Sequence, residues 1–244
     1  MNLNDFASVN TLYQHYNKGS KCLNTLIAYL CGLEDDSWDR AGKTIKEKSS
    51  WYMESYPVIL DCFAKTRDNL QKSNDMTSQV IRSSLVGSWV PTILKPKFTP
   101  AKIEAYCKVT SELTDKKIDG IIVEEGKLTI KDGNIKFEIF EILKATKPLV
   151  SRSETSYTPN IPAVSKLLHF DLPALFPILD KNVAEELYSV SNPSKSDYCK
   201  YFNEIVGLVS DKIWEEKIAP VAKDAGVTEL RLIDCVIFMA KVAI

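Results

Sequence analysis

The segment from residue 158 to residue 183 constrains the fold most, because it contains a helix start, a proline-marked connection and a second helix start. Asn160 is a good N-cap residue and Pro162 suits a first helical turn, so we expect a helix over residues 161–170. The run Phe176–Asp180 (F-P-I-L-D) then leads to a new helix. The pattern predicts two helices that are joined by a short, ordered connection.

Apolar residues at helical spacing indicate further helices along most of the chain. Outside this segment we expect one helix or a helix pair over residues 8–32 and a basic amphipathic turn within residues 36–48. Proline-containing helical segments are expected over residues 75–94 and, third in chain order, 51–65, and further helices over residues 99–115, 135–146, 180–190, 196–205, 212–225 and 228–239. Pro57 should break or kink the third of them, because proline lacks an N–H donor and clashes with the preceding turn. Thr228 should cap the last one, whose wide apolar face is typical of a central packing helix.

One part of the chain carries a convincing β-strand pattern. Residues 120–123 and 127–130 are rich in β-branched and apolar side chains, and the residues between them suit a tight turn. Asp132-Gly133-Asn134 should cap the helix that follows. The sequence therefore predicts a mainly α fold with one short β-hairpin.

Composition argues against several classes of protein and site. No apolar run approaches the roughly 20 residues that cross a bilayer, and the N-terminus lacks the pattern of a signal peptide, so we expect a cytoplasmic protein. The 6 cysteines form no C-x-x-C pair and there are 2 histidines, so we expect no metal site and no cofactor. The net charge of −1 gives no overall attraction to nucleic acid. The lysine-rich run at residues 40–48 is typical of a solvated helix face.

Asp180 is the strongest candidate for a catalytic side chain. We expect it at the N-terminus of a helix, where the helix dipole favours a carboxylate. Free N–H groups at the start of the preceding helix, near Asn160, can bind anions such as DNA phosphates. The alternative is that Asp180 only caps its helix, which is a common role for aspartate.

The run F-P-I-L-D-x-N-V at residues 176–183 resembles the catalytic loop of the helix-hairpin-helix (HhH-GPD) DNA glycosylases, and most of all that of the adenine glycosylases of A/G mismatch repair. Aligned with them without gaps, Thr158-Pro159-Asn160 falls on the family's G-V-G hairpin, and Asp180 falls on its catalytic aspartate. The helix at residues 165–170 is also similar to that of less-characterised bacterial members of the superfamily. The resemblance is confined to this segment.

The resemblance implies a helical fold of two lobes, with a cleft that receives a nucleotide flipped out of the DNA duplex. The lobes would comprise approximately residues 1–115 plus the C-terminal helices, and approximately residues 132–210. Asp180 would stabilise the positively charged, oxocarbenium-like sugar as the base leaves. The residues expected to contact DNA are Thr158, Asn160, Ile161, Lys166, Lys181 and Asn182. Trp89 and Trp51 are candidates for the base pocket, although core packing is the commoner role of tryptophan.

The chain departs from the family's pattern at three points. Its hairpin lacks the glycines. Bifunctional members place a lysine two residues after the hairpin, where this chain has Pro162, so the resemblance implies no lyase activity; Lys166 is expected on a helix face. The iron–sulfur cluster of many relatives needs four cysteines after the aspartate, and only Cys199 and Cys235 follow Asp180, so no cluster is expected.

Three hypotheses follow. The first is a monofunctional, monomeric DNA glycosylase that removes a damaged, mismatched or modified base, in DNA repair or in antiviral defence. The second is a catalytically inactive DNA-binding or protein-interaction module with the same fold. The third is an unrelated helical protein in which the run Phe176–Asp180 is a coincidence. Asp180 should line a cleft with basic residues at its rim in the first case, and should be a buried helix cap in the others.

Overall fold

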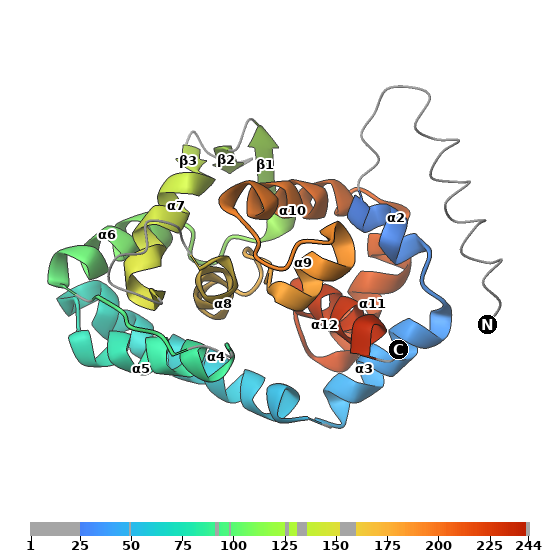
Figure 1. Ribbon diagram of the computed structural model, residues 1–244, viewed down its shortest axis with the longest axis horizontal. Helices are drawn as coiled ribbons and strands as arrows, with labels where there is room; N and C mark the ends of the chain where they lie inside the picture. The colour runs from blue at the N-terminus through green and yellow to red at the C-terminus, as the bar shows by residue number, and fades with distance from the viewer. Residues whose placement is uncertain are drawn as a thin grey trace.

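The computed structural model describes residues 25–48, 50–90, 93–97, 99–124, 127–130, 136–151 and 160–242, and within them the protein is mainly helical, as the sequence predicted (Figure 1). The α-helices are α2 (Thr25–Cys31), α3 (Asp35–Lys46), α4 (Trp51–Ser73), α5 (Met76–Ser88), α6 (Pro100–Ser111), α7 (Ile139–Thr146), α8 (Ile161–Asp171), α9 (Lys181–Tyr188), α10 (Lys195–Leu208), α11 (Ala219–Ala225) and α12 (Glu229–Val242). The remaining elements are the 3₁₀ helices η1 (Ile118–Gly120) and η2 (Lys147–Val150), the π-helix η3 (Trp214–Ile218), and the strands β1 (Ile121–Glu124), β2 (Lys127–Ile130) and β3 (Lys136–Glu138).

Side-chain caps begin several helices. The carboxylate of Asp75 accepts hydrogen bonds from two backbone N–H groups at the start of α5, and Thr99 accepts one at the start of α6. Thr228 Oγ1 accepts a hydrogen bond from the backbone N–H of Arg231 in α12, so the predicted cap of this helix is confirmed. Each cap gives a partner to N–H groups that have none inside the helix.

The sequence predicted a break or a kink at Pro57, and the break is wrong. Helix α4 continues through this residue to Ser73. Pro57 lies on the exposed side of α4, whereas Met53, Ile59 and Phe63 on the same helix are buried. Packing of the apolar face therefore offsets the one backbone hydrogen bond that proline removes.

The hairpin at residues 121–130 is confirmed, but it belongs to a three-stranded antiparallel sheet in the order β1-β2-β3. Residues 136–138, which we expected to be helical, pair with β2, and the helix begins only at Ile139. The third strand gives hydrogen-bond partners to the backbone groups on the free edge of β2. The predicted cap at residues 132–134 lies outside the described residues.

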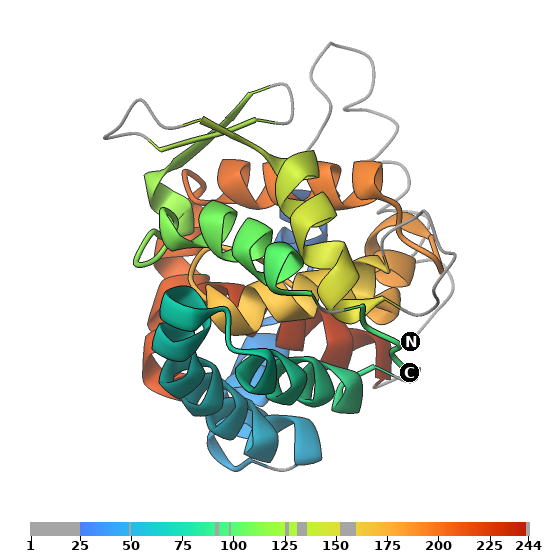
Figure 2. The ribbon, with the colours of Figure 1, turned by 90° about the vertical axis from the view of Figure 1, so that its left-hand side faces the viewer.

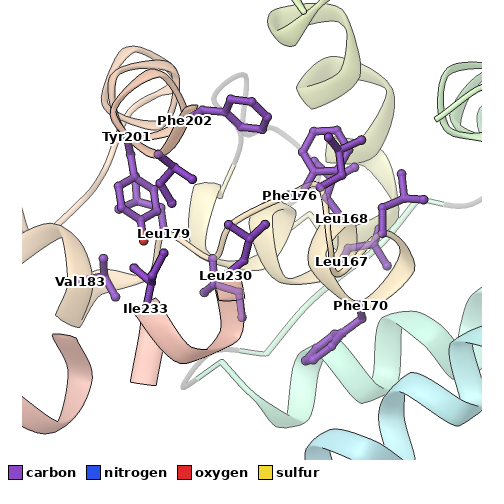
Figure 3. Packing of buried hydrophobic residues seen from close by; sticks show 14 of the residues in the cluster. Leu167, Leu168, Phe170, Phe176, Leu179, Val183, Tyr201, Phe202, Leu230 and Ile233 are labelled. Atoms are coloured by element: carbon purple, nitrogen blue, oxygen red, sulfur yellow. The ribbon is translucent and has the colours of Figure 1, made fainter. Parts of the chain in front are cut away.

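Helix α8 lies at the centre of the fold (Figures 1 and 2), and all of its residues except Pro162 are buried. Helices α4, α5, α7 and η2 pack against it. Figure 3 shows the apolar contacts that surround it, with side chains from α8, from the connection to α9, from α10 and from α12: Leu167, Leu168, Phe170, Phe176, Leu179, Tyr201, Phe202, Leu230 and Ile233. Polar side chains on α8 must therefore find their partners inside the protein.

Helices from both ends of the described chain lie side by side. Helix α3 packs against α11 and α12, and α2 packs against α10 (Figure 1). The expected boundaries of the two lobes stay a prediction. No helix in the described ranges is both long enough and apolar enough to cross a bilayer.

A buried ionic cluster joins the end of α8 to its neighbours. Asp171 Oδ2 accepts a hydrogen bond of 2.6 Å from Tyr106 in α6, and Oδ1 lies 3.2 Å from Arg67 Nε in α4 and 3.2 Å from Arg82 Nη1 in α5. Arg82 Nη2 also donates to the carbonyl oxygen of Phe63 at 2.7 Å. A carboxylate at a helix C-terminus faces the negative end of the helix dipole, so the two arginines are needed there.

We predict that Asp171→Asn lowers the free energy of unfolding by about 3 kcal/mol, because it leaves two buried or half-buried guanidinium groups without their counter-ion. Urea unfolding followed by circular dichroism measures this change. Asp68→Asn is the control, since Asp68 forms an exposed ion pair with Lys72 on α4, and its urea midpoint should stay close to wild type. Equal midpoints for the two variants would contradict the role of the cluster.

Candidate functional site

Two polar side chains of α8 hold the connection between α8 and α9 in place. Ser165 Oγ accepts a hydrogen bond of 3.2 Å from the backbone N–H of Leu179. His169 Nδ1 lies 2.7 Å from the carbonyl oxygen of Phe176. The connection at residues 172–180 is therefore attached to the central helix near its end, directly before the candidate aspartate.

The contacts of His169 define its protonation. A carbonyl oxygen only accepts, so Nδ1 carries the proton and donates to Phe176. Nε2, 2.8 Å from the hydroxyl of Tyr56, is then the acceptor. Burial lowers the pKa of His169 to about 3, against the opposing effect of its bond to Phe176. His169 is a packed, neutral core residue and not an acid or base of a site.

Asp180 is the N-cap of α9 and also an ion-pair partner. Its Oδ1 accepts a hydrogen bond of 3.1 Å from the backbone N–H of Val183, and its Oδ2 lies 3.2 Å from Lys166 Nζ. Lys166 Nζ also donates to the carbonyl oxygen of Trp89 at 3.1 Å. The side chain of Asp180 is 18% exposed and that of Lys166 is 7% exposed. Helix capping uses only Oδ1 of Asp180, and Oδ2 takes part in a separate interaction with Lys166. The capping role therefore does not exclude a functional role.

A cavity of about 1010 Å³ lies beside this pair. Three of the described helices begin at it, because residues 160–162, 180–182 and 191–196 at the starts of α8, α9 and α10 are among its lining residues. The remaining wall comes from α4, from the end of α5 and from α12. Helix starts carry partial positive charge, which favours an anionic group. The starts of α9 and α10 already have side-chain caps, Asp180 and the Ser194–Asp197 capping box, whereas α8 has no side-chain cap.

Charged side chains of both signs line the cavity. The cations are Lys166, Lys181, Lys195 and Arg231, and the carboxylates are Asp180 and Asp234. Lys181 is largely exposed and pairs with Glu185, whereas Arg231 is 4% exposed. The cavity therefore has two buried ion pairs in its wall, one half-buried lysine, Lys195, and one exposed lysine, Lys181.

Most of the predicted site residues meet at this cavity. Those that line it are Asp180, Asn160, Ile161, Lys166, Lys181, Asn182 and Trp89. Trp51 is half exposed and lies outside the lining, but its ring is 6.4 Å from that of Trp89. Thr158 lies outside the described residues. Asn160 occupies the predicted N-cap position of α8, although its side chain makes no capping hydrogen bond.

The structure corrects two expectations from the sequence, those for Lys166 and Trp89. Lys166 is not on a solvated helix face: it is 5% exposed and bound to Asp180, because α8 is buried on every side. Trp89 is both a core residue and a wall of the cavity, since it is 4% exposed and its Nε1 donates to Ser55 Oγ at 3.1 Å. Core packing and a place at the site are not alternatives for this tryptophan.

Sequence reasoning missed the second charged pair of the cavity, Arg231 and Asp234 of α12. Arg231 Nη1 donates to Asp234 Oδ2, and its guanidinium carbon lies 4.8 Å from the ring centre of Tyr56 and 5.0 Å from that of Trp89. Burial raises the pKa of Asp234 to about 6. The available pattern was a charged i,i+3 pair in an otherwise apolar helix, where unpaired charges would be costly.

No family model, curated protein or solved structure matches this chain. What the cavity can do must therefore follow from its own side chains. No group of three or more His, Cys, Asp or Glu residues is placed to hold a metal ion in the described ranges. Two carboxylates with different cationic partners, aromatic wall residues and converging helix starts suit a ligand that has a flat ring and an anionic group.

We predict that His169 makes the fold acid-sensitive. Its folded pKa of about 3 lies below the unfolded value near 6.5, so its contribution to stability is fully present above pH 6.5 and is lost as the pH falls towards 3. Between pH 7 and pH 4 wild type should lose about 3 kcal/mol more than His169→Gln, which cannot titrate. Urea unfolding of both proteins at the two pH values measures this difference, and parallel losses would contradict it.

Proposed function

We propose that this protein is a monofunctional DNA glycosylase of the helix-hairpin-helix superfamily, which hydrolyses the bond between a flipped base and deoxyribose. The observation that carries the proposal is that Asp180, which the F-P-I-L-D-x-N-V run makes the catalytic aspartate, lines a cavity of about 1010 Å³ together with Trp89 and three lysines. A helix cap without a function would not require a cavity at its carboxylate. Lys181 and Lys195, which are among the lining residues, support the proposal as basic groups near the aspartate.

In this proposal the aspartate acts by electrostatics. The flipped nucleotide enters the cavity, and positive charge develops on its sugar as the base departs. The carboxylate of Asp180, held by Val183 and Lys166, already points to a fixed place and needs no reorganisation when that charge appears. Tyr52 and Trp89 in the cavity wall offer aromatic faces near a base.

DNA binding in this proposal is local, because a net charge of −1 gives no overall attraction. The start of α8, which has no side-chain cap, would bind a phosphate next to the flipped nucleotide, and Lys181 and Lys195 in the cavity lining would add positive charge. We further propose a cytoplasmic monomer without a cofactor or an iron–sulfur cluster. A role in DNA repair and a role in antiviral defence would differ in the base that the enzyme removes. A panel of substrates identifies that base.

One observation favours a second candidate, a catalytically inactive module that binds DNA or a protein through the same fold. Lys166 already neutralises Asp180 at 3.2 Å, and an ion-paired carboxylate has less charge to offer a sugar cation. Base release separates the two candidates, since the module would bind without releasing any base.

We predict that wild type releases a base from at least one duplex in a panel of lesions, mismatches and modified phage-type bases, and that Asp180→Asn abolishes the release. Asparagine can still accept the cap hydrogen bond from Val183 while it removes the charge. Strand cleavage after alkali treatment detects the abasic site. Asp75→Asn is the matched control, because Asp75 is also a helix N-cap but lies outside the cavity lining.

The outcomes are distinct. Loss of release in Asp180→Asn but not in Asp75→Asn supports the glycosylase. No release from any duplex by wild type, with equal DNA affinity of wild type and Asp180→Asn, would support the inactive module instead.

We also predict no Schiff base at Lys166. Lys166 Nζ donates to Asp180 and to the carbonyl of Trp89, and a nitrogen held in these two hydrogen bonds is not placed to attack the sugar. Borohydride added during turnover should therefore trap no covalent protein–DNA complex. A trapped complex that disappears in Lys166→Arg would contradict the monofunctional assignment.

A further inference from the structure

We propose that Asp234 is a second catalytic carboxylate of the cavity, the general acid that gives a proton to the departing base. This inference rests on the proposed glycosylase function. It assigns a role to the one carboxylate in the cavity lining that the resemblance leaves unused.

The two carboxylates reach the cavity from different elements. Asp180 stands at the start of α9, and Asp234 lies in the middle of α12, which packs against α9. Arg231 and Cys235 of the same helix also line the cavity. A base that departs from a sugar beside one carboxylate therefore has a second one within the same enclosed space.

Arg231 orients Asp234. Its guanidinium lies against the rings of Tyr56 and Trp89 and donates through Nη1 to Asp234 Oδ2. This bond engages one of the two carboxylate oxygens of Asp234, Oδ2. The aromatic contacts limit the movement of Arg231, so the orientation of the carboxylate is fixed before a ligand binds.

The two carboxylates have different surroundings, which suits different roles: Asp234 as the acid and Asp180 as the stabiliser of the sugar cation. Burial, and after it the charge of Asp180, raise the pKa of Asp234 to about 6, although Arg231 and Lys166 oppose the shift. Three other titratable groups interact electrostatically with Asp234: Tyr56, Tyr201 and Cys235. Each carboxylate has a direct cationic partner, Arg231 for Asp234 and Lys166 for Asp180. Asp180 also caps a helix start and its side chain is 18% exposed, whereas that of Asp234 is 7% exposed. Carboxylates in two different environments can take separate roles, one as a proton donor and the other as a stabiliser of the sugar cation.

The reaction balances with water as the only co-reactant. The bond between sugar C1′ and the base nitrogen breaks, and its electron pair goes to the base. The proton of Asp234 neutralises a ring nitrogen or oxygen of that base, while Asp180 stabilises the sugar cation. Water then adds to C1′ and releases a proton to solvent, from which Asp234 recovers its own.

The test uses single-turnover base release by wild type, Asp234→Asn and Asp234→Glu between pH 5 and pH 8. On the neutral base identified in the panel, the wild-type rate should fall above about pH 6. Asp234→Asn should be about 100-fold slower and lose this pH dependence, and Asp234→Glu should recover part of the rate.

A second substrate shows whether the slow base release by Asp234→Asn comes from the loss of a proton donor. Duplexes with 7-methylguanine, for a purine enzyme, or 5-fluorouracil, for a pyrimidine enzyme, carry bases that leave more readily without a proton. On them Asp234→Asn should approach wild type, and the wild-type rate should not fall above pH 6. The wild-type pH profiles alone test the inference if the variant does not fold.

Failure of the inference differs from failure of the function. Absence of any base release by wild type overturns the glycosylase itself. Release that needs Asp180 but is unchanged in Asp234→Asn, or equally slow on both kinds of base, overturns only the role of Asp234. The latter result would make Asp234 a structural partner of Arg231.

Discussion

Complete burial of α8 is the constraint on which the site depends. A helix with no solvent-exposed face must pair each of its polar side chains with another part of the protein. Ser165 and His169 pair with the backbone of the connection to α9, and Asp171 pairs with two arginines and a tyrosine. The same hydrogen bonds that satisfy the core therefore position the loop that ends in Asp180.

The cavity is a consequence of the same packing. Lys166 is on α8, so the central helix supplies the counter-ion of Asp180, while α12 supplies Arg231 and Asp234. Charges in such an enclosed place interact more strongly than at a surface. A change of charge at one of these groups would therefore alter the electrostatic energy of the others.

Local patterns predicted the helices well because caps, prolines and apolar spacing act within a few residues. The starts at Thr99, Asn160 and Thr228 were found in this way. The failures have tertiary causes. Helix α4 passes through Pro57 because its other face is buried, and residues 136–138 form a strand because the edge of β2 is available to them.

The sequence by itself determined that Asp180 stands at a helix start after an ordered connection, since the residues responsible are neighbours in the chain. Only the tertiary structure decided which groups meet that carboxylate. The cavity lining brings together residues that are far apart in the sequence: Trp89, Lys166 and Asp234. No local sequence pattern specifies which faces of their helices pack against one another. The physical reason is that their meeting depends on how α8 and α12 bury their faces, which is a property of the whole core.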